Sequence, residues 1–134
     1  NMGNHVVSQL ITKMKKKNIQ IKNSKILIMG LTFKENCADI RNSGIKNVIE
    51  GLKKFNCNLD LYDPWADSQE IKKTHNITPI LKLSQNTYHG VIIAVSHDQF
   101  RTMGINNIYK LCKKKHVIYD LKHLFPKDLV DLRL

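Results

Sequence analysis

Short strand-like runs alternate with amphipathic segments along this sequence, and that alternation limits the folds open to it. Residues 25–31 form a continuous apolar run, as expected for a strand that is buried on both faces. Further strands are predicted at residues 58–64, 90–97 and 116–122, with a weak one at 77–80. Helical spacing of apolar residues predicts helices at residues 43–55, 66–75 and 98–112. Strands that alternate with helices pair in parallel through right-handed crossovers, so we predict an α/β fold with a Rossmann-like, doubly wound parallel sheet.

A further amphipathic helix precedes the first strand. Residues 3–17 place apolar side chains at helical spacing, which predicts one helix that reaches the start of the chain. Position 1 is not a methionine, so we expect a fragment of a longer chain. Ser43 and Asp98 stand where two later helices begin and are their expected N-caps.

The formal net charge of +11 admits two interpretations. Lysines and arginines that neutralise phosphates supply most of the non-specific affinity for nucleic acids. Here the basic residues lie mostly late in predicted helices or just past them, where they complement the helix dipole, and no aromatic residues are interleaved with them. We therefore expect a solvated basic surface that favours anionic small molecules, and no nucleic-acid partner.

The apolar runs are also too short for a membrane partner. A membrane-spanning helix needs roughly 18 or more apolar residues, and the start of the chain lacks the apolar core of a signal peptide. We therefore expect no membrane association and a cytoplasmic location. The three cysteines, Cys37, Cys57 and Cys112, are widely spaced and lack a partner at metal-ligand spacing, so we expect reduced thiols and no metal site.

The segment KILIMGLTFKENCADIRNS, which contains the first strand, departs from a dinucleotide-binding loop. Ligands of doubly wound sheets bind at the carboxyl ends of the strands, where a G-x-G-x-x-G motif allows close approach to a pyrophosphate. Only Gly30 of such a motif is present. The loop instead carries Lys34 and Arg41, which predicts a phosphate clamp beside a helix N-terminus. The alternative is that Arg41 pairs with Asp39 or Glu35 and that Lys34 is solvated; the residues alone favour neither.

Other polar and aromatic residues have both a chemical and a structural interpretation. Cys37 lies between two cations and is either a nucleophile or an unreactive, packed thiol. His97 and Asp98 follow a predicted strand and suggest an acid–base pair, but Asp98 suits a helix cap and a single strand-end histidine is usually structural. Trp65 is placed to stack on a base or, as we favour, to pack against the sheet edge.

The motif GLTFKENCADIRNS, followed after a helix by LYDPWAD, resembles the C-terminal, UDP-binding domain of the UDP-glucose/GDP-mannose dehydrogenase family. Within that family, it is most similar to the branch that oxidises UDP-N-acetylglucosamine or UDP-N-acetylgalactosamine to uronic acids for bacterial surface polysaccharides. The resemblance extends to the closing segment VIYDLKHLFPK. It implies an NAD-dependent 6-dehydrogenase of a UDP-N-acetylhexosamine, or of UDP-glucose, that serves capsule or O-antigen synthesis.

The resemblance also implies a domain arrangement. Such enzymes have an N-terminal domain that binds most of the NAD, a helical central domain that dimerises and carries the catalytic cysteine, and a domain of the present kind. Residues 1–20 would then be the end of a central-domain helix, and residues 21–134 the UDP-sugar-binding domain. The parent protein would be a homo-oligomer, and this chain alone would be inactive.

Individual roles follow from the resemblance alone. Phe33 and Lys34 match a pair that contacts the substrate, and Arg41 matches an arginine that contacts NAD. Lys122 aligns with a basic, substrate-binding residue that is an arginine in some relatives, and a lysine there is a weaker point charge than a bidentate arginine. The alternative hypothesis is a stand-alone Rossmann-like module that binds or regulates without catalysis.

Overall fold

Five strands form one parallel sheet in the computed structural model, which describes residues 2–41 and 43–134. In chain order the strands are β1 (Lys25–Met29), β2 (Asn58–Tyr62), β3 (Tyr88–Ile93), β4 (Cys112–Asp120) and β5 (Leu132–Arg133). They are hydrogen-bonded in the order β2-β1-β3-β4-β5, and every neighbouring pair is parallel. The sheet confirms the predicted α/β fold.

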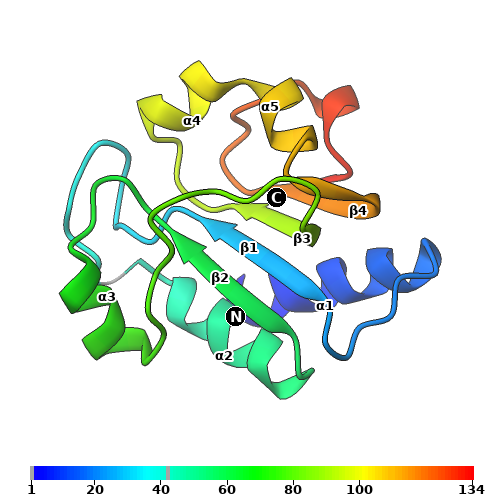
Figure 1. The fold of residues 1–134 in the computed structure, drawn as a ribbon, viewed down its shortest axis with the longest axis horizontal. Coiled ribbons are helices and arrows are strands. Elements are labelled where there is room, and N and C mark those ends of the chain that lie inside the picture. The colour runs from blue at the N-terminus through cyan, green and yellow to red at the C-terminus, as the bar shows by residue number, and fades with distance from the viewer. Residues whose placement is uncertain (1, 42) are drawn as a thin grey trace.

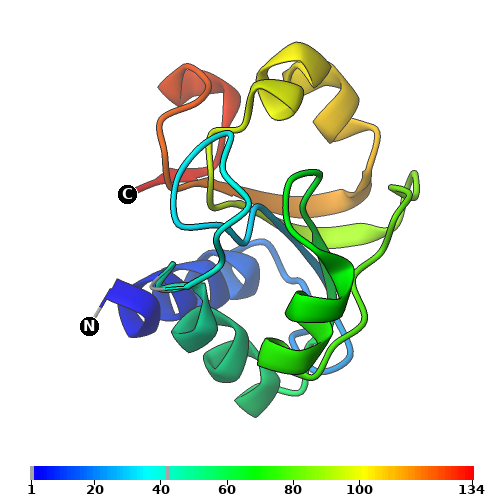
Figure 2. The same cartoon turned by 90° about the vertical axis from the view of Figure 1, so that its left-hand side faces the viewer.

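Helices cover both faces of this sheet (Figures 1 and 2). One layer holds α1 (Met2–Lys16), α2 (Ile45–Lys54) and α3 (Ser68–His75). The other layer holds α4 (Asp98–Met103), α5 (Ile105–Tyr109) and the 3-10 helix η1 (Lys127–Leu129). Among the described residues, no helix is long and apolar enough to cross a membrane.

Strand β1 is buried on both faces, as its continuous apolar sequence predicts. Its Ile26 and Ile28 pack in the core that includes α1 and α2, whereas Leu27 and Met29 pack in the core that includes α4 and α5. Successive side chains of a strand point to opposite faces, so this one strand contributes to both cores.

Helix α1 is an integral part of the first core. Its Val6, Leu10 and Met14 are completely buried, and they belong to the same cluster as Val48 and Leu52 of α2. The apolar face predicted from helical spacing is therefore the face that packs against the rest of the fold. The predicted division at residue 20 concerns the longer protein and stays a prediction.

The strand order reverses between β1 and β3, and the loops that follow these two strands start at the same edge of the sheet. In doubly wound sheets, ligands bind in the crevice at such a reversal. Gly30 lies at this point with φ +99°, and a Cβ added to it would be 2.7 Å from the Val95 Cβ. Glycine is therefore required where the two loops diverge.

Two predicted elements differ in the structure. The weak strand predicted at residues 77–80 is wrong: this segment is a loop, in which the Ile80 N–H donates to the Leu61 C=O at 2.9 Å. The helix predicted at residues 98–112 is divided into α4 and α5. Gly104 separates them because its φ of 78° and ψ of 159° lie outside the helical region.

Helix ends and the last strands also differ from the predictions. The N-cap of α2 is Gly44 rather than Ser43, although the Ser43 hydroxyl accepts a hydrogen bond from the Ile45 N–H at 3.4 Å. Asp98 is the first residue of α4 and not its cap. Strand β4 begins at Cys112 rather than at residue 116, and β5 was not predicted.

Substitution of Gly30 tests the crowding at the strand reversal. Gly104, which lies between α4 and α5, is the control. Gly104→Ala should destabilise the fold by about 1–3 kcal/mol, because a side chain there is strained but meets no atom within 4 Å. Gly30→Ala should cost about 1–3 kcal/mol more than that, because its Cβ would also overlap Val95. Urea unfolding of both variants measures the difference, and equal losses would show that Val95 moves away without cost.

Candidate functional site

The loop between β1 and α2 stands at the carboxyl edge of the sheet, coloured cyan in Figures 1 and 2. It folds back on itself, since the Phe33 N–H donates to the Asp39 C=O at 2.6 Å. The Ile40 side chain is buried in the core shared with α1 and α2, which anchors the later half of the loop. Residues 33–36 are exposed. The first half of the loop is therefore exposed to solvent, while the hydrogen bond to Asp39 and the buried Ile40 hold the loop in place.

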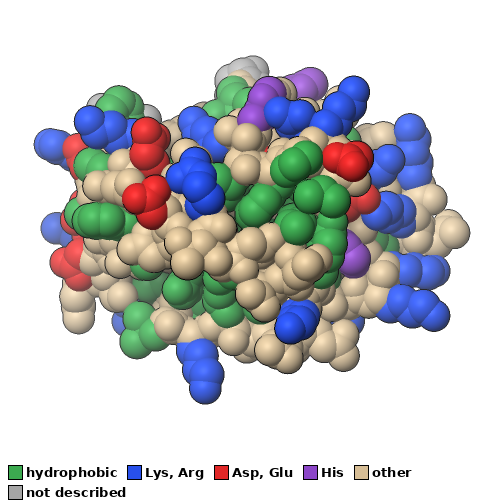
Figure 3. Space-filling view, turned by 90° about the horizontal axis from the view of Figure 1, so that it is seen from above, with side chains coloured by type: hydrophobic (Ala, Val, Ile, Leu, Met, Phe, Trp, Pro, Cys, Tyr) green, Lys and Arg blue, Asp and Glu red, His purple; other side chains and the backbone are tan. Residues whose placement is uncertain are grey.

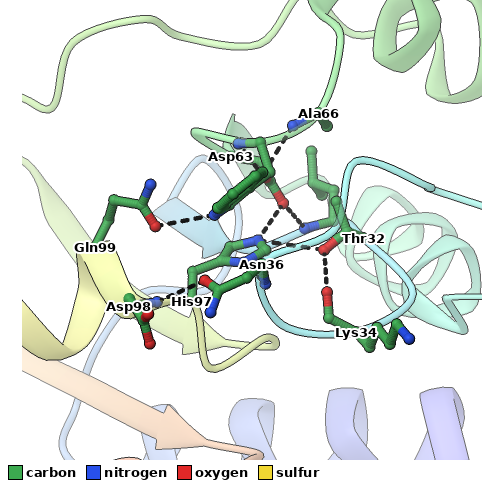
Figure 4. A network of polar contacts seen from close by, with 10 residues as sticks. Thr32, Lys34, Asn36, Asp63, Ala66, His97, Asp98 and Gln99 are labelled. Carbon is green, nitrogen blue, oxygen red and sulfur yellow. Dashed lines mark hydrogen bonds and ion pairs between the residues drawn. The ribbon is translucent and has the colours of Figure 1, made fainter.

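A buried carboxylate fixes the base of this loop (Figure 4). Asp63 directly follows β2, and its Oδ2 accepts hydrogen bonds from the Leu31 N–H at 2.7 Å and from His97 Nε2 at 3.0 Å. Its Oδ1 accepts from the N–H groups of Trp65 at 2.7 Å and Ala66 at 3.1 Å. The side chains of Asp63 and His97 are completely buried. One carboxylate thus joins the segments that follow β1, β2 and β3, which are neighbours in the sheet.

His97 connects this carboxylate to the exposed part of the loop. Its Nδ1 accepts a hydrogen bond from the Asn36 N–H at 2.9 Å, so the proton lies on Nε2, which donates toward Asp63. Thr32 Oγ1 lies 3.2 Å from the same Nε2 and donates its own hydrogen to the Lys34 C=O at 2.9 Å. These contacts set the main-chain course of residues 32–36.

The surroundings of Asp63 favour its ionised form. Burial raises the pKa of this carboxyl, but the hydrogen bonds from His97 and from the N–H groups of Leu31 and Trp65 lower it by more. The resulting pKa lies below the ordinary value of 3.8. Because both oxygens are already occupied by donors and the side chain has no exposed surface, Asp63 holds the structure together and is not placed for proton transfer.

A second buried aspartate organises the turn after β4. Asp120 is completely buried, its Oδ1 accepts from the Lys122 N–H at 3.1 Å, and its Oδ2 accepts from the Phe125 N–H at 2.9 Å. These bonds fix the turn that carries the exposed Lys122 side chain. Strand β3 lies between β1 and β4, so this turn and the loop after β1 stand on opposite sides of β3.

The structure places the predicted site residues at the carboxyl edge without gathering them into one cluster. The residue Phe33 is 55% exposed although its side chain is apolar. Within residues 2–41 and 43–134, no carboxylate pairs with the Lys34 ammonium. Arg41 donates to both oxygens of Asp39, from Nε at 3.0 Å and from the terminal nitrogen at 3.1 Å. Arg41 is therefore ion-paired with Asp39 and Lys34 is exposed, and the role of these two cations as a phosphate clamp stays a prediction.

Sequence analysis did not connect His97 with Asp63. It weighed a pair of His97 and Asp98, whereas the Asp98 N–H donates to Asn36 Oδ1 at 3.1 Å and the Asp98 carboxylate pairs with Arg101. The structural interpretation of His97 is therefore the correct one. The sequence does show that His97 and Asp63 each follow a predicted strand. This indicates a contact between them only when the two strands are known to lie close together in the sheet.

Trp65 links the loops that follow β2 and β3. Its indole Nε1 donates to Gln99 Oε1 at 3.0 Å, and its ring lies 6.3 Å from the His97 ring, measured between centroids. It thus covers one side of the buried network. Cys37 is half-buried and is not in a disulfide. The described part of the chain holds no group of His, Cys, Asp and Glu side chains suited to a metal ion.

Known proteins are similar in sequence to this chain along its whole length. Residues 27–127 match the UDP-glucose/GDP-mannose dehydrogenase family, UDP binding domain. The chain belongs to this family. The matched residues of this dehydrogenase-family domain include the loop with Lys34 and Arg41 and the turn with Lys122. The predicted resemblance is thereby confirmed.

Two relatives in the dehydrogenase family are similar over nearly all of the chain. The UDP-N-acetyl-D-glucosamine 6-dehydrogenase of Salmonella typhi is 46% identical over 134 residues, which are 100% of this chain and 32% of that protein. The enzyme of the same name from Pseudomonas aeruginosa is 44% identical over 133 residues, 99% of this chain and 32% of that protein. The chain spans about a third of the length of these relatives.

A solved structure supports the fold of this family domain. The NDP-N-acetyl-D-galactosaminuronic acid dehydrogenase from Methanosarcina mazei Go1 superposes with a TM-score of 0.75 at 16% identity. The superposition covers 95% of this chain and 26% of that one. At this identity the similarity establishes the arrangement of helices and strands.

The dehydrogenase family implies NAD, and the first loop of this sheet does not fit a dinucleotide at its base. Val95 occupies the space beside Gly30, since a Cβ there would contact Val95 at 2.7 Å. A side chain therefore has no room at position 30, and the loop lacks the further glycines that let a pyrophosphate approach the main chain in dinucleotide-binding loops. Arg41, at the exposed far end of the loop, is the predicted cofactor residue that stays accessible.

Replacing the buried carboxylate tests its role in holding the loop. Asp63→Asn should destabilise the fold by about 1.5–3 kcal/mol, because an amide NH2 would face the N–H donors that now bond to a charged oxygen. Asp67→Asn is the matched control, because Asp67 is the exposed N-cap of α3 and asparagine caps helices equally well; its change should stay below about 0.5 kcal/mol. Equal stability of the two variants in urea would contradict the role given to Asp63.

The variant Asp63→Asn also predicts how the stability of the fold depends on pH. Because the pKa of Asp63 is lower in the folded state, its stabilisation is complete above the ordinary value of 3.8 and is lost as the pH falls through the folded-state pKa. The stability difference between the unmodified chain and Asp63→Asn should therefore be largest near neutral pH and shrink in acid. Unfolding curves measured between about pH 2 and pH 7 test this, and a difference that grows in acid would be the wrong sign.

Proposed function

We propose that this chain is the UDP-sugar-binding part of an NAD-dependent nucleotide-sugar 6-dehydrogenase. The observation that carries the proposal is the match of residues 27–127 to the UDP binding domain, with 46% identity along the chain to a UDP-N-acetyl-D-glucosamine 6-dehydrogenase. The reaction oxidises C6 of a UDP-N-acetylhexosamine, or of UDP-glucose, to the carboxylate. The uronic acid formed would serve capsule or O-antigen polysaccharide.

The first half of the loop binds the substrate in this proposal. The Lys34 ammonium is free of ion pairs within the described residues and pairs with the anionic UDP-sugar, while the exposed Phe33 ring supplies an apolar contact beside it. Lys122 adds a second cation from the turn after β4. Because His97 and Asp63 already fix the main chain of the loop, little conformational entropy is lost when the ligand binds.

The second half of the loop faces the cofactor in this proposal. Arg41 contacts NAD, and its pair with Asp39 gives way at little cost because an exposed ion pair contributes little stability. NAD would serve as the hydride acceptor when bound. Oxidation of a primary alcohol to a carboxylate removes two hydrides, so it would use two NAD molecules in succession, with water supplying the added oxygen. Most of the NAD site, the catalytic cysteine and the contacts that make the parent protein a homo-oligomer lie in domains outside this chain.

Variants of the parent enzyme separate the two halves of the loop. Lys34→Ala should lower the affinity for UDP-sugar roughly ten- to 150-fold, because a charge-assisted contact is worth about 1.5–3 kcal/mol, and should leave NAD affinity nearly unchanged. Arg41→Ala should weaken NAD binding more than UDP-sugar binding. Titrations of each variant with each ligand measure the four affinities.

Lys72→Ala is the control, because Lys72 is an exposed lysine of α3 and should leave both affinities unchanged. If both loop variants lose only UDP-sugar affinity, the loop is a single phosphate clamp and the division between its halves is wrong. If neither variant loses affinity for any ligand, the two cations are solvated or internally paired, and the proposed site is wrong.

The chain by itself should not reduce NAD with any UDP-sugar, because hydride transfer needs the cofactor domain and the catalytic thiol. The purified 134-residue chain, incubated with NAD and with UDP-N-acetylglucosamine or UDP-glucose, should show no increase in NADH absorbance. The full-length parent is the positive control. Turnover by the chain alone would overturn the proposed division of labour.

A further inference from the structure

A second polar site lies at the amino-terminal edge of the sheet, opposite the loops described above. A cavity of about 460 Å³ opens between the segment that follows α1 and the starts of β3 and β4. Its charged and titratable lining consists of Lys22, Lys113, Lys114, Lys115 and His89, and no acidic residue lines it. Figure 3 shows Lys and Arg side chains gathered at the right-hand end of the molecule, where β1 begins in Figure 1.

The fold positions three of these lysines by interrupting the pairing of β3 with β4. Tyr88 is opposite Cys112, and Gly90 is opposite Val117, so the single residue His89 faces the four residues 113–116. A bulge of this kind removes residues from the ladder and turns their side chains to new directions. The consecutive lysines are therefore displayed around His89.

Two hydrogen bonds fix the main chain of the bulge. His116 Nδ1 donates to the Lys113 C=O at 2.8 Å, and the His116 C=O accepts from the Lys17 ammonium at 2.7 Å. Lys17 is in turn paired with Asp131 of the segment before β5. The main chain beneath the three lysines is thus fixed at both sides, and the lysine side chains are exposed.

The charges at the cavity are not neutralised by the protein. Neighbouring lysines have partners, since Lys17 pairs with Asp131 and Lys25 pairs with Asp60. In the part of the chain that the structure describes, the four lysines that line the cavity pair with no carboxylate. Like charges on adjacent residues repel one another, and an anion in the cavity would remove that repulsion.

His89 adds a directed donor to this cluster. Its Nδ1 accepts a hydrogen bond from the Lys25 N–H at 3.1 Å, so the proton of the neutral ring lies on Nε2. Burial and the nearby positive charge of Lys113 both lower the pKa of His89. The ring therefore offers an N–H group in a positively charged, half-buried position.

We propose that this cavity binds a phosphorylated small molecule, with its phosphates held by Lys113, Lys114, Lys115 and Lys22. The Nε2–H of His89 donates to the same anion, and Ile19 supplies an apolar wall for the rest of the ligand. The lining contains no Phe, Tyr or Trp, so it lacks the large aromatic platform on which proteins stack the bases of single-stranded nucleic acids. The site is separate from the proposed UDP-sugar site, because the two lie at opposite ends of the strands.

Inorganic pyrophosphate is the probe that tests this site on the ¹⁵N-labelled 134-residue chain at constant ionic strength. Saturable changes in NMR chemical shift should occur at His89 and residues 113–115, and sodium sulfate of equal ionic strength should not reproduce them. The triple variant Lys113→Ala/Lys114→Ala/Lys115→Ala should raise the Kd for pyrophosphate at least about tenfold. The control Lys54→Ala/Lys72→Ala/Lys73→Ala removes the same charge from exposed positions outside the cavity and should change the Kd by less than about twofold.

Four outcomes would overturn the proposal. Without saturable shifts at His89 and residues 113–115 in the unmodified chain, the cavity does not bind phosphate, whatever the variants do. An equal loss of pyrophosphate affinity in the two triple variants would show that the diffuse positive field of the protein, and not this cavity, attracts the anion. Tighter binding of a short DNA duplex than of pyrophosphate at the same residues would assign this surface to nucleic acid. Shifts confined to Phe33 and Lys34 would place pyrophosphate at the other edge and leave this cavity without a ligand.

Discussion

The buried Asp63 carboxylate is the interaction on which the carboxyl edge of the sheet depends. It accepts hydrogen bonds from Leu31, Trp65, Ala66 and His97, which follow three adjacent strands. A charge removed from water is stable only when donors replace the lost hydration, and here main-chain N–H groups and one neutral imidazole do so. The described residues of the loop after β1 form no helix or strand, so these contacts set the course of its first half.

The hydrogen bonds that fix the main chain leave the side chains of the predicted site exposed. Thr32 is buried and bonded to His97, while Phe33 and Lys34, directly after it, face solvent. The amino-terminal edge shows the same division, since hydrogen bonds close the bulge at residues 113–116 and its lysines remain unpaired within the described chain. A rigid backbone with free charged ends lowers the cost of ordering a binding site, which suits both edges to anions.

Local sequence patterns predicted the elements whose form depends on their own residues. The continuous apolar run of β1 and the apolar stripe of α2 are buried as expected. The pattern failed at residues 77–80, where Ile77 packs against one core and Ile80 against the other without joining the ladder. It also failed at Gly104, because apolar periodicity continues through that position although its backbone conformation ends a helix.

The sequence by itself determined the α/β class and, through the motif around Lys34 and Arg41, the family, since both depend on residues that are close along the chain. Only the tertiary structure decided that Asp63 and Thr32 meet at His97 and that His89 faces the three lysines of the bulge. Thr32 and Asp63 are 65 and 34 positions from His97. Contacts of that separation depend on the strand order β2-β1-β3. The spacing of residues along the chain does not indicate which strands become neighbours in the sheet.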